Sequence, residues 1–236
     1  MRRSQAVEWQ SFLLELNGTV NHFKFADPDA LTNTGTYSTA FLTSNQRTST
    51  SSVTLSFSGS TITAGASIFS GAKDGDFIVV TGATNEDNNG THKISSVTSN
   101  TVVVTTSTFT TESNTASCKV RTNVKGATGL TLLASTNAAS GTIKKGDYLQ
   151  IQSAANTTAT PTQIVMVTED ATATADGAKD FYGVAIQPKL RSDLATGHYA
   201  VFTNPKGTFR LISNEVSWSA DRISNYGISF SCIEVI

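Results

Sequence analysis

The chain has 236 residues, of which 38% are hydrophobic and 15% are charged, and its formal net charge is −1. This length fits one large or two modest domains and is enough to bury a core. The near-neutral charge, without a cluster of Lys and Arg, argues against sequence-independent nucleic-acid binding, which depends on counterion release, and no apolar run approaches the ~20 residues of a membrane-spanning helix.

The N-terminal segment lacks the pattern of an export signal. Arg2 and Arg3 supply positive charge, but polar residues interrupt the apolar stretch from Trp9 to Leu16. A signal peptide needs a contiguous apolar region. We therefore expect the protein to be made and assembled in a cytoplasm.

Residues 5–17 carry the strongest helix prediction. Their apolar side chains recur at i, i+3, i+4 and i+7 and make one face; they are Trp9, Phe12, Leu13 and Leu16. Ser4 is a candidate N-cap, and Asn17-Gly18 supplies the stop. We expect this face to be buried against a sheet that contains Phe230.

A short strand follows the helix. Phe23 and Phe25 share one face, with His22 and Lys24 on the other, and the turn residues Asp27-Pro28-Asp29 close the segment. This alternation is typical of a half-buried strand.

Two polar stretches, 43–52 and 111–115, flank a compact set of strand-like runs. Turn residues separate these runs, which predicts a small antiparallel barrel or sandwich. The runs are 53–57, 77–80, 92–94 and 101–104. We therefore predict that residues 49–120 form a separate β domain on two polar linkers, inserted into a core made of residues 1–48 and 121–236.

The pattern Lys-x-Gly-Asp followed by an aromatic residue occurs twice, at 73–77 and 144–148. Each copy predicts a tight turn that feeds a strand, with the glycine at a positive φ and the aspartate bonded to nearby backbone. Two copies indicate either two barrels of related build or a turn that arose twice.

The last third of the chain is rich in strand patterns, at 181–186, 199–202, 208–211 and 226–232. In the last of these, Tyr226, Ile228, Phe230 and Cys232 alternate with small residues, which makes it the clearest strand prediction. Cys232 accordingly reads as a buried small hydrophobe.

The sequence carries no catalytic motif. His22, His92 and His198 are isolated from one another, and there is no nucleophile motif, phosphate-binding loop or zinc-ligand spacing. We predict no catalytic, cofactor-binding or metal-binding residues, no cofactor and no enzyme activity. A disulfide between Cys118 and Cys232 stays open, although cytosolic thiols are mostly reduced.

The richest acidic loop, at 85–90, has two interpretations. Its oxygen-bearing side chains are of the kind that binds calcium. However, the EF-hand spacing is absent, and Asn89-Gly90 between two strand runs is a strong hairpin-turn signal. The turn is the favoured interpretation.

Several segments resemble a known family. Residues 12–18 and 23–29, and then 145–151, 203–211, 214–216 and 226–234, are similar, in that order, to distal tail proteins of long-tailed phages and gene transfer agents. The resemblance spans roughly residues 8–45 and 121–236, and residues 49–120 depart from it. Within that departure, 75–82 and 89–98 resemble a small β domain found as an insertion in many phage tail proteins.

The resemblance implies a mainly β protein, with an antiparallel β-sandwich or barrel core, one N-terminal amphipathic helix and an inserted small β domain. It implies a structural virion protein at the phage tail tip, or baseplate, which forms a ring at the distal end of the tail tube. The expected partners are further copies in a cyclic homo-oligomer, a hexamer, together with the tail-tube protein and tail-tip hub or fibre proteins. Neither stable nucleic-acid binding nor membrane insertion is expected, and the insert could contact a host surface glycan during attachment.

Alternative functions stay open at this point. A tail-tube or other minor tail protein would share the same sandwich ancestry. A host-carbohydrate-binding module, acting through the insert, belongs to a different class. A tail-associated glycan hydrolase is the least favoured, because no motif supports it.

Overall fold

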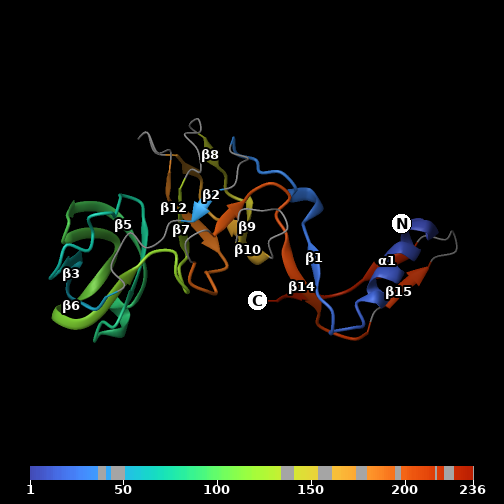
Figure 1. Ribbon diagram of the computed structural model, residues 1–236, viewed down its shortest axis with the longest axis horizontal. Helices are drawn as coiled ribbons and strands as arrows, with labels where there is room; N and C mark the ends of the chain where they lie inside the picture. The colour runs from blue at the N-terminus through green and yellow to red at the C-terminus, as the bar shows by residue number, and fades with distance from the viewer. Residues whose placement is uncertain are drawn as a thin grey trace.

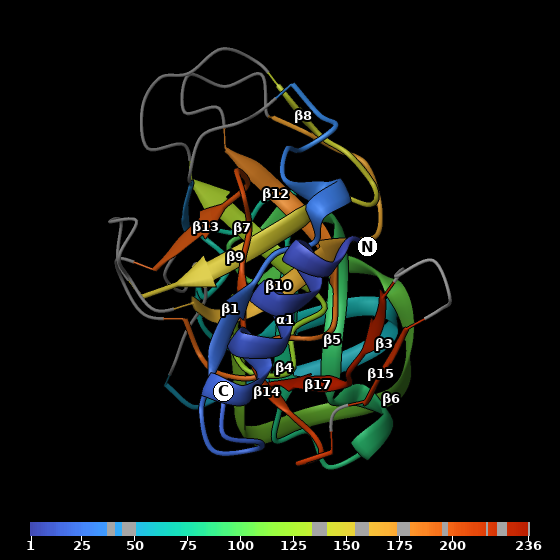
Figure 2. The same cartoon turned by 90° about the vertical axis from the view of Figure 1, so that its right-hand side faces the viewer.

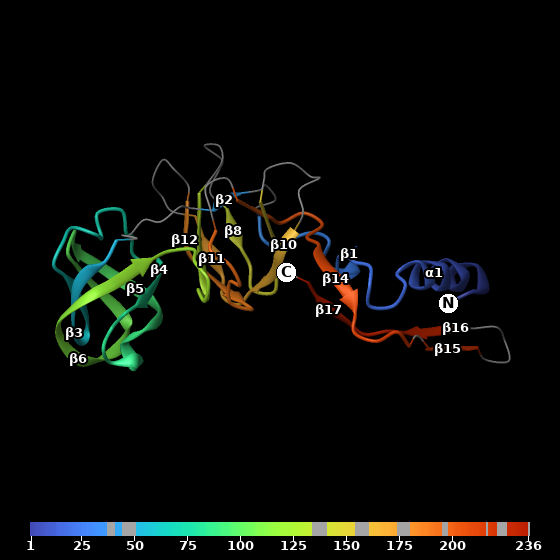
Figure 3. The same cartoon turned by 60° about the horizontal axis from the view of Figure 1, so that its bottom comes forward.

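The computed structural model describes residues 1–36, 41–43, 51–133, 141–153, 161–173, 180–194, 198–215, 217–220 and 226–235. Within these ranges the chain is mainly β, with one α-helix and several antiparallel sheets, which confirms the predicted fold class. Figures 1 and 3 show three units in a row, each with its own cluster of buried apolar residues.

At one end of the row, a helix lies beside an open sheet; we call this the helix–sheet unit. Its sheet has the strand order β1-β14-β17, and β15 and β16 form a separate hairpin. Seen from that end, these elements face the viewer (Figure 2). They are α1 (Arg3–Glu15), β1 (Phe23–Phe25), the 3-10 helix η1 (Pro28–Ala30), β14 (Gly207–Leu211), β15 (Ser217–Ala220), β16 (Tyr226–Ser229) and β17 (Cys232–Glu234).

The middle unit is a closed barrel with the strand order β10-β12-β7-β2-β13-β9, and we call it the central barrel. Closure pairs every strand on both sides, and the alternating inward side chains fill the interior. Leu130, Ile151 and Phe181 are fully buried there. The elements are β2 (Phe41–Thr43), β7 (Gly129–Leu133), β8 (Thr142–Ile143), β9 (Tyr148–Gln152), β10 (Pro161–Val167), β11 (Ala171–Thr172), β12 (Phe181–Gln187) and β13 (Tyr199–Val201).

The third unit, at the other end of the row, comprises residues 53–121, and we call it the insert (Figure 1). It contains β3 (Val53–Ala64), β4 (Phe77–Thr81), the 3-10 helix η2 (Glu86–Asn88), β5 (Gly90–Ser99) and β6 (Val102–Arg121). The long strand β6 pairs with β3, β4 and β5. Every residue of its buried cluster lies between Val53 and Val120, so these residues make a core of their own.

The helix prediction is confirmed in place but not in its first residue. α1 begins at Arg3 with Arg2 as N-cap, where the Gln5 side chain accepts a hydrogen bond from the Arg2 backbone N–H, so the prediction of a Ser4 cap was wrong. Asn17 and Gly18 adopt positive φ just after the helix, as a stop requires. No helix of the described chain is long and apolar enough to cross a membrane.

The second predicted linker does not exist. Residues 111–115 lie inside β6, and the carboxylate of Glu112 accepts hydrogen bonds from the backbone N–H groups of Thr84 and Asn85. Polar side chains on one face of a strand are compatible with pairing, and composition alone missed this. Most of the other predicted linker, 43–52, falls on residues 44–50, outside the described ranges.

The last predicted strand is divided in two. β16 pairs with β15, whereas β17 pairs with β14, so the alternation of 226–232 spans two different sheets. Ile228 and Phe230 are half-buried, but Cys232 is exposed, and the prediction that it is buried was wrong. The alternation fails at the point where the chain changes sheets.

Candidate assembly surface

The helix–sheet unit has a thin core. Its buried cluster consists of Leu13, Leu16, Phe23 and Leu211 in the described chain. Leu13 and Leu16 come from the predicted apolar face of the helix, one turn apart, and face the sheet. The other two predicted positions of that face are less covered, because Phe12 is half-buried and Trp9 is 38% exposed.

Aromatic rings connect the helix to the sheet. The Phe12 ring meets the Phe23 ring edge to face at a centroid distance of 5.5 Å, and Trp9 lies 5.9 Å from both Phe12 and Phe230. Phe209 of β14 continues the series at 6.2 Å from Phe23. These distances fall in the favourable range for aromatic pairs, so the rings connect the helix to the sheet, although Trp9 remains 38% exposed.

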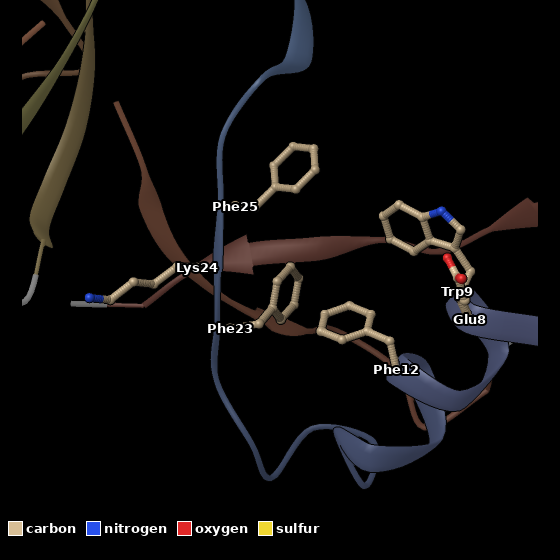
Figure 4. A pocket seen from close by; sticks show the side chains of 6 residues that line it. All are labelled: Glu8, Trp9, Phe12, Phe23, Lys24 and Phe25. Atoms are coloured by element: carbon tan, nitrogen blue, oxygen red, sulfur yellow. The ribbon is translucent and has the colours of Figure 1, made fainter. Parts of the chain in front are cut away.

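An open groove of about 380 Å³ lies between α1 and β1. Figure 4 shows Phe12, Phe23 and Phe25 around it, with Lys24 extending to the opposite side of the strand. Phe25 is 38% exposed. The full lining is Glu8, Trp9, Phe12, Phe23, Lys24 and Phe25. Apolar walls with one acid and one base at the rim suit a protein surface better than a small charged substrate.

The hairpin adds a second exposed apolar area. All four residues of β15 are exposed, and Trp218 among them is 48% exposed. Beside it, Leu14 on the outer face of α1 is 70% exposed, and a hollow of about 240 Å³ lies between them. The hairpin joins the helix at its other strand, where the backbone of Met1 exchanges hydrogen bonds with that of Tyr226.

The strands of this unit also leave backbone edges open. In the described chain, β1 and β17 each pair only with β14, and β15 and β16 pair only with each other. Unpaired strand edges expose N–H and C=O groups that readily pair with another chain. We call the groove, the hairpin and these edges together the candidate assembly surface.

The unit is nevertheless attached to the central barrel. Glu234 of β17 accepts a hydrogen bond from the backbone N–H of Ile164 at 2.6 Å. Its other oxygen lies 2.7 Å from Arg191 Nη1, an ion pair whose geometry is not that of an aligned hydrogen bond. Gln150 of the barrel accepts a further bond from the backbone N–H of Lys206. The exposed apolar side chains therefore sit on an anchored element.

The histidines lie on separate elements. His22 precedes β1, His92 is in β5, and His198 precedes β13. The His92 ring lies within hydrogen-bond distance of Ser107 Oγ and the Asn88 carbonyl, and burial lowers its pKa. Its ring atoms are thus used within the insert. Among the described residues, no group of three or more potential metal ligands occurs.

The asparagines of the acidic loop at 85–90 use their side-chain oxygens within the insert. Asn85 caps η2 by accepting from the Asp87 N–H, and Asn89 bonds both backbone groups of Ala83. The Asn88 amide donates to Glu112. The loop joins the antiparallel strands β4 and β5, as the turn interpretation predicts, and it contains η2 before β5 begins at Gly90.

Both cysteines are free thiols, Cys118 buried in the insert and Cys232 exposed on β17, so no disulfide joins them.

Comparison with known proteins brought no matching family model, no matching curated protein and no matching solved structure. Sequence reasoning missed Trp218, whose only signal is a large aromatic residue in a run of small polar ones.

Proposed function

We propose that the protein is a structural component of a phage tail, which forms a ring at the distal end of the tail tube. The observation that carries the proposal is the candidate assembly surface. It combines half-exposed aromatic side chains with unpaired strand edges on an element anchored to a closed barrel. Of the segments that resemble distal tail proteins, 12–18, 23–29, 203–211, 214–216 and 226–234 belong mostly to this same unit, and 145–151 lies in the central barrel.

A ring is favoured because exposed aromatic side chains and unpaired strand edges are both unfavourable in an isolated chain. Apolar surface gains roughly 25 cal/mol for each Å² removed from water, and an exposed strand edge invites uncontrolled pairing. A closed ring satisfies both, because each copy covers one neighbour and is covered by the other. We propose a hexamer, with the tail-tube protein on one side and tip hub or fibre proteins on the other.

The net charge of −1 supports the same proposal. A ring through which DNA passes must not bind phosphates, and binding of that kind needs clustered Lys and Arg. We therefore propose a neutral to acidic lumen and no stable nucleic-acid complex. No enzymatic activity is proposed.

The test combines mass with position. Native mass spectrometry across protein concentrations should show one closed oligomer, and labelled chain in intact particles should lie at the end of the tube. The double variant Trp9→Ala/Trp218→Ala should shift the mass towards monomer. The matched control is Met166→Ala, an exposed apolar residue of the central barrel, which should leave the mass unchanged.

Two outcomes would contradict the proposal. Stacked copies along the tail would favour a tail-tube protein. A monomer at all concentrations, located singly on a fibre, would exclude the ring.

A further inference from the structure

The two Lys-x-Gly-Asp turns are the same structure. The glycine φ is 91° at Gly75 and 92° at Gly146. In both turns, one aspartate oxygen accepts the backbone N–H of the lysine three residues earlier at 2.9 Å. In each turn the glycine N–H donates to, and the aspartate carbonyl accepts from, the backbone of one residue in the second strand after the turn. This residue is Ile94 of β5 in the insert and Val167 of β10 in the central barrel.

The likeness continues around both barrels. β4 pairs with β5 and with the end of β6, as β9 pairs with β10 and β13. The start of β6 pairs with β5 and with the end of β3, as β12 pairs with β10 and β7. The single strand β3 of the insert therefore corresponds to two strands of the central barrel, β2 and β7. In the same way, the single strand β6 corresponds to β12 and β13.

The registers agree at most of the pairs that both ladders contain, up to the register shift between Phe181 and Val184. With the two turns aligned, the pair Val80–Val120 corresponds to Ile151–Ala200. The pair Thr61–Val104 likewise corresponds to Gly129–Ala185. Fully buried residues then coincide: Ile62 with Leu130, Ile78 with Leu149, and Ile94 with Val167. The repeated turn therefore marks two barrels of one build.

Each turn also reaches beyond itself. The second oxygen of Asp76 accepts the Thr131 hydroxyl of the central barrel at 2.6 Å. The second oxygen of Asp147 accepts the Thr34 hydroxyl, from the segment that leaves the helix–sheet unit, at 2.8 Å. In both turns one aspartate oxygen accepts a hydrogen bond within the turn, and the other accepts one from the hydroxyl of a threonine outside the turn.

The insert's turn docks where two glycines leave room. A Cβ on Gly129 would lie 2.0 Å from the Phe77 ring, and a Cβ on Gly183 would lie 1.9 Å from the Gly75 carbonyl oxygen. Ion pairs flank this contact, at 3.3 Å between Lys93 and Glu169 and at 2.9 Å between Arg121 and Asp193.

We infer that the insert is a second copy of the central barrel, docked on it by the Lys-x-Gly-Asp turn, and that Gly129, Thr131 and Gly183 form a receiving surface matched to this partner. The equivalent positions of the insert are Thr61, Thr63 and Val102. Thr61 and Val102 carry the side chains that the contact cannot accommodate, so the outer end of the insert is closed to a third copy. The two barrels form one rigid arm.

The test of rigidity uses the full chain. ¹⁵N relaxation should give the wild-type insert and central barrel one common rotational correlation time. Gly129→Thr, which places the insert's own residue on the receiving surface, should give the insert a separate, shorter time. Thr61→Gly, the same exchange in reverse at the outer end, should change nothing. A wild-type insert that tumbles independently would overturn the inference, and so would unchanged tumbling of Gly129→Thr.

A gentler pair of variants covers the case in which Gly129→Thr does not fold. Thr131→Val keeps the side-chain shape but removes the hydroxyl that Asp76 accepts, and should speed amide exchange in the 73–76 turn about tenfold or more. Thr34→Val should instead speed exchange in the 144–147 turn. Equal effects of both variants on both turns, or no effect of Thr131→Val, would overturn the assignment of Asp76 as the docking group.

Discussion

The two barrels and the helix–sheet unit differ in how completely they bury their apolar residues. Each barrel surrounds a buried cluster with paired strands, whereas the helix–sheet unit has a buried cluster of four residues in the described chain and leaves Trp9, Phe25 and Trp218 partly in solvent. A closed sheet has no edge and encloses its own interior. A small open sheet and a hairpin, with one helix lying against the hairpin, have edges and a rim. The barrels therefore bury their cores without a second copy of the chain. The helix–sheet unit is the part whose apolar side chains and strand edges would gain most cover from a neighbouring copy.

The largest expected effect separates the two kinds of core. Phe181→Ala, at a fully buried site in the central barrel, should lower the free energy of unfolding by about 3–5 kcal/mol. Phe12→Ala should cost distinctly less in the monomer, because the Phe12 ring is half-buried. Urea titration of both variants measures the difference. Equal losses would mean that the helix–sheet unit has a core as complete as that of the barrel.

The next prediction concerns the independence of the insert. Replacing residues 49–120 with a short Gly/Ser link should leave a soluble chain that unfolds cooperatively, since the insert's buried cluster is its own. We expect a smaller loss than for Phe181→Ala, because mainly Val79, the Asp76 contact and the Lys93–Glu169 ion pair are removed from the central barrel. Calorimetry of the shortened chain provides the check. A chain that no longer folds would show that the insert completes the core.

The cysteines report on the surface without disturbing it. Cys232 is exposed on β17 while Cys118 is buried in the insert, and burial raises the pKa of both thiols. A thiol reagent should modify Cys232 in the folded protein and Cys118 only after unfolding, because only Cys232 is accessible to the reagent. Modification of Cys232 should slow as protein concentration rises, if β17 becomes covered on assembly. Rates that do not depend on concentration would place β17 outside the interface.

The smallest expected effect is the pH dependence of the insert. Burial alone would raise the pKa of Glu112, but hydrogen bonds from Thr115, Thr84, Asn85 and Asn88 lower it to about 2. A lowered folded-state pKa means that the stabilisation is complete above the ordinary value of 4.5 and is lost as the pH falls towards 2. Glu112→Gln should therefore be less stable than wild type at pH 7, with the difference shrinking below pH 4.5. A constant difference over that range would show that the charge of Glu112 contributes nothing.

Local patterns in the sequence were sufficient for several features. The period of Phe12, Leu13 and Leu16 placed the helix, alternation placed the strand around Phe23, and a run of apolar residues placed the strand at 181–186. The turn at 73–76 was also readable, because a glycine with positive φ followed by a backbone-bonding aspartate is a local requirement. These features depend on neighbours within one turn or one strand, so a single sequence is enough to predict them.

Pairing and exposure were decided by the tertiary structure. Composition made residues 111–115 a linker, yet β6 runs through them because β3 lies alongside. Alternation made Cys232 buried, yet the chain changes sheets after Phe230. Alternation states that a strand has two faces, but only contacts between residues far apart in the chain select its partner and the face that is covered. For the same reason, the two Lys-x-Gly-Asp turns could be found in the sequence, whereas the shared build of the two barrels follows only from their strand registers.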